Sequence, residues 1–378
     1  MFFLLFYINK NIIIKRGFMK KYIILLLCLM ITIVGCKKEI VRIETIYLEN
    51  VFSIMPCIKI MEKEKTINYE EIKNDLNKIL LDLHYKYDVF NDNSLISKVN
   101  NMAGIDEVIV DNEFISLVKI TNNVSNITKI NDVSLYDISI HSVWKVWDFT
   151  NNYYQHYNYA NIPTDEIIKQ KLPLVNYNNI LINEENNTLY LKEKGMSIDL
   201  GSMIKGYSAD LIYEYLIERG YKNFLIDVGG NVITNGFNIS EDRHFTVGIN
   251  MPFSYNNVVG SIKTQKEKMS FVTSGIYERY IVSKGDKKMY HHILNPNTGY
   301  PENNELYSVT IVSNNSCYGD CFSTAVFLMG LDEGLKFIES RSELEAVFIT
   351  KDKEIQLSSG LKSIFNLNIN QNDYKIKN

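Results

Sequence analysis

Strand-like and helix-like segments alternate irregularly along most of this 378-residue chain. Apolar residues recur at helical spacing after Tyr69, Asp111 and Ser202, whereas residues 180–192 form two alternating runs around a polar turn, as in a β-hairpin. A buried-strand pattern over residues 223–233 contains a double glycine, and no regular βαβ period appears. We therefore predict an α+β fold of mixed and antiparallel sheets with flanking helices, rather than a doubly wound sheet.

The N-terminal region has the layout of a bacterial lipoprotein signal. After Met19, two lysines precede an apolar run over residues 22–34, and a glycine and Cys36 follow it. We expect lipid on Cys36 and a location at the bacterial cell membrane, facing the periplasm or the extracellular side. A transmembrane anchor is the alternative, although the run is short for a span. The expected organisation is a signal region over residues 1–36, translated from Met19, a tether over 37–50 and one folded domain over 51–378.

Charge and cysteine content exclude several classes of function. The formal net charge is −4, so no broad basic surface is available for nucleic acid. Outside the signal region the cysteines are Cys57, Cys317 and Cys321, an odd number without the spacing of a disulfide framework. Cys317 and Cys321 lie one helical turn apart with no histidine nearby, so we expect them to pack and not to bind zinc.

Residues 196–212, MSIDLGSMIKGYSADLI, pass from a strand-like to a helix-like pattern through Gly201 and Ser202. The free N–H groups and partial positive charge of a helix start suit a phosphate, and Lys205 adds a cation. Asp199, however, is an acid where an anion would bind, so it either caps the helix or faces another part of a ligand. Two interpretations stay open, an anion site and a capped helix.

Asp320 and Thr324 stand four residues apart on a helix that we predict over residues 316–330. This spacing places both side chains on one helix face. A carboxylate and a hydroxyl are hard oxygen ligands, which suit Mg²⁺ or Ca²⁺. The alternative is an N-terminal cap followed by a buried threonine.

Two histidines, His291 and His292, end a strand pattern just before the turn over residues 295–299. A histidine at a strand end beside a tight turn is well placed for proton transfer, although a single histidine is more often structural. Residues 272–280, VTSGIYERY, add a glycine-bearing strand edge where backbone groups approach a ligand closely.

The order of these motifs resembles that of the ApbE family, the FAD:protein FMN transferases. The motifs are DLGxxxKG, VGG, TSGxYxRY, HIxNPxTGYP and DxxxT, and the resemblance runs from about Ser53 to the last helix. It implies a two-lobed, T-fold-like architecture with an FAD cleft between the lobes. It also implies an enzyme that transfers the FMN half of FAD to a Ser or Thr hydroxyl of another protein and releases AMP, with Mg²⁺, or alternatively Ca²⁺, as the metal.

The resemblance assigns roles to individual residues. It implies that His292 deprotonates the acceptor hydroxyl, and that the Ser202 carbonyl, Asp320 and Thr324 bind the metal. Ser202 stands where the family usually has glycine, which leaves a carbonyl ligand unaffected. The residues implied to contact FAD are Met55, Phe90, Leu135, Tyr136, Asp137, Asp199, Lys205, Thr273, Ser274, Gly275 and Ile293.

The implied protein partner is an exported flavin-carrier subunit of a membrane redox complex. The acceptor motif Asp-Gly-x-Thr/Ser-Gly-Ala-Thr/Ser does not occur in this chain, so we expect the chain not to be its own carrier. Two alternatives use the same cavity: an FAD pyrophosphatase that gives FMN and AMP, and a lipoprotein that binds FAD without catalysis.

Overall fold

The computed structural model describes residues 41–63, 65–151, 159–254, 256–265, 267–368 and 373–377. The signal region predicted over residues 1–36, with Cys36 in it, lies outside these ranges. Among the helices that are described, none has both the length and the apolar character needed to cross a membrane.

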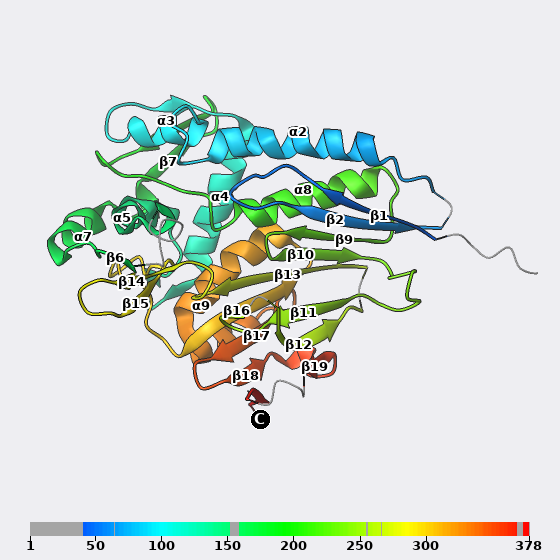
Figure 1. Ribbon diagram of the computed structural model, residues 1–378. Coiled ribbons are helices and arrows are strands. Elements are labelled where there is room, and N and C mark those ends of the chain that lie inside the picture. The colour runs from blue at the N-terminus through cyan, green and yellow to red at the C-terminus, as the bar shows by residue number, and fades with distance from the viewer. Residues whose placement is uncertain are drawn as a thin grey trace, which may run out of the picture. The chain divides into compact units, whose positions relative to one another are not determined.

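A nine-stranded sheet is the centre of the fold (Figure 1). Neighbouring strands are antiparallel except at one edge, where β18 and β20 run parallel. The strand order is β1 (Arg42–Tyr47), β2 (Cys57–Glu62), β9 (Phe224–Val228), β10 (Asn231–Asn235), β13 (Lys268–Gly275), β16 (Leu306–Ser313), β17 (Glu345–Thr350), β18 (Glu354–Leu357) and β20 (Lys375–Ile376).

The two faces of this sheet belong to different cores. Helices α8 (Ile204–Glu218) and α9 (Ser316–Glu339) lie against one face (Figure 1). Strand β17 shows the alternation, because Ala346 and Phe348 join the core beneath the helices whereas Val347 and Ile349 join the opposite one. That opposite core is covered by a three-stranded sheet of β11 (Thr246–Asn250), β12 (Val258–Lys263) and β19 (Phe365–Leu367).

The other elements surround this framework. Helix α2 (Tyr69–Tyr87) packs on α8, and α4 (Asn112–Ile127) packs on α9. A third core surrounds the fully buried Trp147. The remaining elements of the described residues are the helices α3 (Leu95–Asn101), α5 (His141–Trp147) and α7 (Asp165–Lys171), the 3₁₀ helices η1 (Ile138–Ile140), η2 (Leu172–Leu174), η3 (Tyr177–Asn179) and η4 (Ser359–Leu361), and the strands β3 (Val108–Ile109), β4 (Lys129–Ile130), β5 (Val133–Ser134), β6 (Tyr159–Ala160), β7 (Ile180–Asn183), β8 (Thr188–Leu191), β14 (Tyr280–Ser283) and β15 (Met289–His291).

The α+β prediction is confirmed, and so are α2, α4, α8 and the β7–β8 hairpin. The structure differs at the segment predicted as a tether, where Arg42–Tyr47 form edge strand β1. An edge strand with mostly exposed side chains has little hydrophobic alternation, which is why the sequence pattern missed it. The next strand, β2, begins at Cys57, since Val51 and Ile54 form only an isolated bridge.

Helix α9 extends beyond its predicted end at residue 330 to Glu339. The helical path is broken at Gly330, whose φ of 76° lies in the left-handed region that glycine adopts without strain. The predicted end therefore marks a real kink. Cys317 and Cys321 are buried on α9 as free thiols, which confirms that they pack and do not bridge.

Candidate active site

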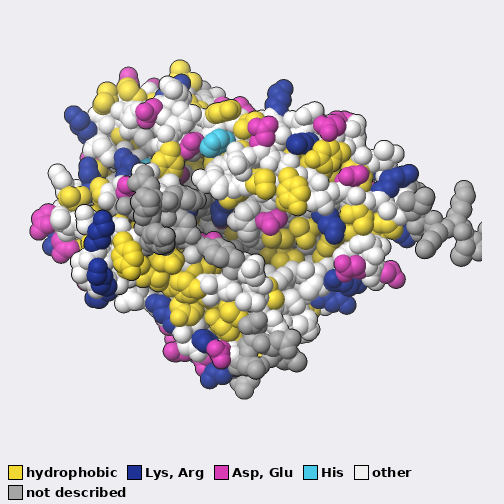
Figure 2. All heavy atoms as spheres, viewed as in Figure 1, with side chains coloured by type: hydrophobic (Ala, Val, Ile, Leu, Met, Phe, Trp, Pro, Cys, Tyr) yellow, Lys and Arg dark blue, Asp and Glu magenta, His cyan; other side chains and the backbone are white. Residues whose placement is uncertain are grey.

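A cavity of about 1500 Å³ lies where the ends of several elements meet. Its wall includes residues from α2, α5, the start of α8, β13 and α9. Figure 2 shows the face in view hollowed near its centre, with hydrophobic side chains around the hollow. The predicted site residues that line the cavity are Phe90, Leu135, Tyr136, Asp137, Asp199, Ser202, Lys205, Thr273, Ser274, Gly275, His292, Ile293, Asp320 and Thr324.

Met55 is the predicted residue that the structure does not place in the cavity wall. Its side chain is 56% exposed, whereas Ser53 and Ile54 line the cavity. The segment turns tightly here, with a φ of 65° at Ser53, so sequence spacing does not indicate which side chain faces inward. Ile54 also accounts for the first glycine of the VGG motif, because a Cβ on Gly229 would lie 2.5 Å from its Cγ2.

Asp199 is not the cap of helix α8. The helix begins at Ile204 after Met203, which makes no side-chain capping bond. Asp199 Oδ1 instead accepts the Gly201 N–H at 3.0 Å, in the turn before the helix. The interpretation of Asp199 as a helix cap is therefore wrong, and its carboxylate lines the cavity.

The backbone of residues 197–199 is fixed by neighbouring segments, which holds Asp199 in place. The Ser142 hydroxyl accepts the Ser197 N–H at 2.8 Å, and the Ile138 carbonyl accepts the Asp199 N–H at 3.2 Å. The Asn100 side-chain amide accepts the Ile198 N–H at 2.8 Å and donates to the Ile198 carbonyl at 3.0 Å. Desolvation raises the pKa of Asp199 to about 6, and the positive charge of Arg279 opposes this rise.

Asp137 uses its carboxylate within the protein. One oxygen accepts the Ser139 N–H at 2.8 Å and the Ser139 hydroxyl at 2.6 Å, and the other accepts the Tyr177 N–H at 2.8 Å. Burial raises the pKa of Asp137, while these bonds favour the ionised form. The Asp137 carboxylate therefore holds the cavity wall together at the start of η1.

Helices α8 and α9 cap each other where they meet. Asp320 Oδ2 on α9 accepts the Gly206 N–H of the first turn of α8 at 2.9 Å. Asp210 on α8 accepts the first N–H groups of α9, from Ser316 at 3.1 Å and Cys317 at 2.8 Å. The cap within α9 is its own N-cap residue, Asn315, so the interpretation of Asp320 as a cap of its own helix is wrong.

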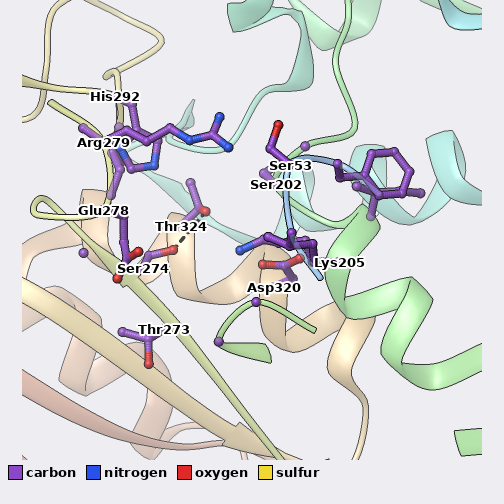
Figure 3. A pocket seen from close by; sticks show the side chains of 18 of the residues that line it. Ser53, Ser202, Lys205, Thr273, Ser274, Glu278, Arg279, His292, Asp320 and Thr324 are labelled. Carbon is purple, nitrogen blue, oxygen red and sulfur yellow. Dashed lines mark hydrogen bonds between the residues drawn. The ribbon is translucent and has the colours of Figure 1, made fainter. Parts of the chain in front are cut away.

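The donor set of the predicted metal site comes together at this junction. Asp320, Thr324 and Ser202 all line the cavity, and Lys205 lies beside Asp320 (Figure 3). Burial raises the pKa of Asp320, and the charge of Lys205 opposes this rise. The described part of the chain contains no cluster of three or more His, Cys, Asp or Glu able to hold a metal. A carboxylate, a hydroxyl and a carbonyl nevertheless fit a hard cation such as Mg²⁺.

Ser202 and Tyr136 form a partly buried hydrogen-bonded pair next to this donor set. The Ser202 hydroxyl and the Tyr136 hydroxyl are 2.8 Å apart, and Tyr136 donates to Cys321 Sγ at 3.4 Å. This pattern makes the Ser202 hydroxyl the donor to Tyr136. The Ser202 side chain thus links the start of α8 to Tyr136, just before η1, and Tyr136 in turn contacts Cys321 on α9. The Ser202 carbonyl is left for a ligand.

His292 is oriented by the backbone of Arg279. The Arg279 carbonyl accepts the His292 N–H at 3.1 Å and lies 3.0 Å from His292 Nδ1. A carbonyl only accepts, so Nδ1 carries the proton and Nε2 is left as the basic nitrogen. Burial, followed by the charge of Arg279, lowers the pKa of His292 to about 3.

The structure adds cavity residues to which sequence reasoning gave no role. The Arg279 guanidinium extends into the cavity opposite Lys205 and Asp320 (Figure 3). It belongs to the motif TSGxYxRY, so its cationic type was the available signal. His141 also lines the wall, and sequence reasoning gave it no role.

Aromatic side chains line the cavity in two places. Phe90 and Trp144 have ring centroids 6.5 Å apart, and Phe253 and Tyr280 have centroids 6.1 Å apart. Aromatic faces bind planar ring systems, and cationic side chains with a hard-oxygen donor set bind a pyrophosphate. The cavity therefore suits a dinucleotide with two ring systems.

Comparison with known proteins agrees with this chemistry. The chain is 33% identical to the FAD:protein FMN transferase of Klebsiella pneumoniae over 267 residues, 70% of this chain and 78% of the relative. It is 26% identical to that of Treponema pallidum over 282 residues, 71% and 74% of the two chains.

Solved structures share the fold. The flavin transferase ApbE from Vibrio cholerae matches with a TM-score of 0.72 at 21% identity, covering 85% of this chain and all (100%) of that one. The ApbE protein from Thermotoga maritima matches with a TM-score of 0.73 at 25% identity, covering 85% and 99%. The sequence profile of the ApbE family matches residues 55–348, and the chain belongs to the ApbE family.

Proposed function

We propose that this chain is a transferase that moves the FMN half of FAD to a Ser or Thr hydroxyl of an acceptor protein and releases AMP. The observation that carries the proposal is a single cavity in which a neutral histidine, two cations and a hard-oxygen donor set face one another. These are His292, Arg279 and Lys205, and the Asp320–Thr324–Ser202 set. Relatives with the FAD:protein FMN transferase name support the same activity.

The reaction is a phosphoryl transfer in which the acceptor oxygen attacks the phosphorus of the FMN half. A new P–O bond forms to the acceptor, the P–O bond to the AMP phosphate breaks, and AMP leaves as a phosphate monoester. His292 Nε2 takes the proton of the acceptor hydroxyl, because Nδ1 is engaged with the Arg279 carbonyl. Arg279 and Lys205 attract the pyrophosphate and balance its charge.

We further propose that Asp320, Thr324 and the Ser202 carbonyl hold Mg²⁺, with Ca²⁺ as the alternative ion. The metal would neutralise negative charge on the pyrophosphate and on the departing AMP. Asp320 suits this role because the Gly206 N–H orients its carboxylate at a buried position and the charge of Lys205 favours its ionised form. Thr324 is held toward the cavity by Ser274, whose hydroxyl lies 3.3 Å from Thr324 Oγ1.

The proposed acceptor is an exported flavin-carrier subunit of a membrane redox complex. The basic and apolar segment that ends at Cys36 supports a lipid-anchored enzyme at the cell membrane, facing the periplasm or the extracellular side. An anchored enzyme would meet such a subunit on the surface where both are exposed.

Incubation of the protein with FAD, Mg²⁺ and a peptide that carries the acceptor motif tests the proposal. We expect AMP and a peptide whose mass increases by that of an FMN group. A peptide with valine in place of the acceptor threonine is the matched control and should gain no mass. Steady release of FMN and AMP at the same rate without any acceptor would assign the cavity to hydrolysis instead. If the protein retains FAD and forms no product, it is an FAD-binding protein without catalytic activity.

A further inference from the structure

His141, the first residue of α5, occupies an unusual place in the cavity wall. It lines the cavity, yet its side chain is only 4% exposed. Its ring stacks on Trp144, with centroids 6.0 Å apart and an interplanar angle of 17°. The stack fixes the plane of the imidazole, so its two nitrogens point in set directions.

Among the residues that the structure describes, none forms a hydrogen bond with a ring nitrogen of His141. Nδ1 is buried without a partner and lies 3.8 Å from Asp199 Oδ2, beyond hydrogen-bond distance. No hydrogen bond from the described residues reaches Nε2 either. Buried polar atoms are almost always paired, and Nδ1 is such an atom without a partner, so the imidazole is not used within the described structure and is available to a ligand in the cavity.

The neighbourhood of His141 determines which nitrogen is the acceptor. The Asp199 carboxylate only accepts when ionised, so it favours the proton on the nearby Nδ1 and leaves the Nε2 lone pair for a ligand. Burial, followed by the charge of Lys145, lowers the pKa of His141 to about 3, so the ring is neutral at neutral pH. A neutral imidazole with a free Nε2 accepts one N–H group.

His141 and Asp199 are held at this separation by the backbone. The Ser142 hydroxyl, next to His141, accepts the Ser197 N–H at 2.8 Å and donates to the Ser197 carbonyl at 3.2 Å. These bonds join the start of α5 to the strand-like segment that carries Asp199. The pair is therefore a preformed part of the wall.

We propose that His141 is a specificity-determining residue of this cavity, whose Nε2 accepts an N–H group from a ring edge of bound FAD. The inference rests on the proposed function for the identity of the ligand. FAD offers this chemistry at two places, the imide N–H of the flavin ring and the exocyclic amine of adenine. Trp144 stacked on His141 supplies the adjoining aromatic surface.

Binding of FAD, FMN and AMP to the wild-type protein, His141→Phe and His141→Gln tests the proposal. Phenylalanine keeps the stack on Trp144 but removes both nitrogens, whereas glutamine restores an acceptor. We expect His141→Phe to weaken FAD binding about 5- to 10-fold, the effect of one lost hydrogen bond. FMN binding should weaken alone if the flavin edge is read, and AMP binding alone if the adenine edge is read. His141→Gln should recover part of the loss.

The control variant is His244→Gln, because His244 lies outside the cavity wall. Unchanged binding of all three ligands by a folded His141→Phe protein would overturn the proposal, as would equal weakening of FMN and AMP. The ¹⁵N shifts of His141 should also report a proton on Nδ1, and a proton on Nε2 would contradict it. If the wild-type protein binds FAD but releases no AMP, the proposed transferase function is wrong. The His141 proposal would still be tested by the binding measurements.

Discussion

Asp210 on α8 and Asp320 on α9 each accept N–H groups from the first turn of the other's helix. The Asp320 carboxylate that orients α8 also lines the cavity, whereas Asp210 lies outside the cavity wall. The junction thus contains the first turns of α8 and α9, the proposed metal ligand Asp320, and Lys205. The helix starts hold acidic groups because their free N–H groups stabilise negative charge.

Gly206→Ala should disrupt this junction. A Cβ at Gly206 would lie 2.1 Å from the Ser316 carbonyl oxygen, so the two helices would have to separate. We expect a loss of about 2–3 kcal/mol in the free energy of unfolding, measured by urea denaturation. Gly285→Ala is the control, because its Cβ would meet only Ser283 Oγ at 3.6 Å. Equal stability of the two variants would contradict the packing argument.

Asp320→Asn and Asp210→Asn separate metal binding from helix capping. Both remove one carboxylate from the junction, but only Asp320 lines the cavity. We expect Asp210→Asn to lower the melting temperature, since it removes charge from the start of α9. Addition of Mg²⁺ should raise the melting temperature of the wild type and of Asp210→Asn, and should not raise that of Asp320→Asn. Equal stabilisation of both variants by Mg²⁺ would reject Asp320 as a ligand.

Asp199→Asn should stabilise the protein at high pH. The pKa of Asp199 is raised to about 6, so the folded state binds more protons than the unfolded state between pH 4 and 6. The ionised group therefore lowers stability above pH 6, and this cost disappears as the pH falls below about 4. We expect a gain of about 1–2 kcal/mol at pH 8 and little gain at pH 4. A variant that is less stable than the wild type at pH 8 would contradict the argument.

His292→Gln should abolish transfer without abolishing FAD binding. Removal of the proton acceptor is expected to lower the rate about 10²- to 10⁴-fold, with a change in the Kd for FAD of roughly threefold or less. His291→Gln is the control, because the neighbouring His291 does not line the cavity and its Nε2 pairs with the Glu302 carbonyl at 2.9 Å. If both variants keep wild-type rates in the acceptor assay, His292 is not the base.

Local spacing pointed to several residues of the site, and the resemblance to the ApbE family gave them their roles. The four-residue spacing of Asp320 and Thr324 and the glycine at the start of α8 led to residues that do share one cavity. The reciprocal caps were not predictable in this way, because the two N–H groups that Asp210 accepts lie 106 and 107 residues away in the sequence.

The misplaced and missed residues have a common physical cause. Met55 was assigned to the cavity from its place in a motif, but positive φ angles at Phe52 and Ser53 redirect the side chains of that segment. His141 was not singled out by any sequence pattern, and it becomes notable only when its ring lies beside Asp199. Side-chain direction in turns and unpaired polar atoms depend on tertiary packing, which local pattern does not encode.

The stoichiometry of AMP to flavinylated acceptor tests the central claim most directly. In a single incubation with FAD, Mg²⁺ and an acceptor peptide, AMP is quantified by chromatography and the FMN–peptide adduct by mass spectrometry. Transfer predicts one AMP for each adduct and no free FMN. AMP in large excess over adduct, matched by free FMN, would contradict transfer and assign the cavity to hydrolysis.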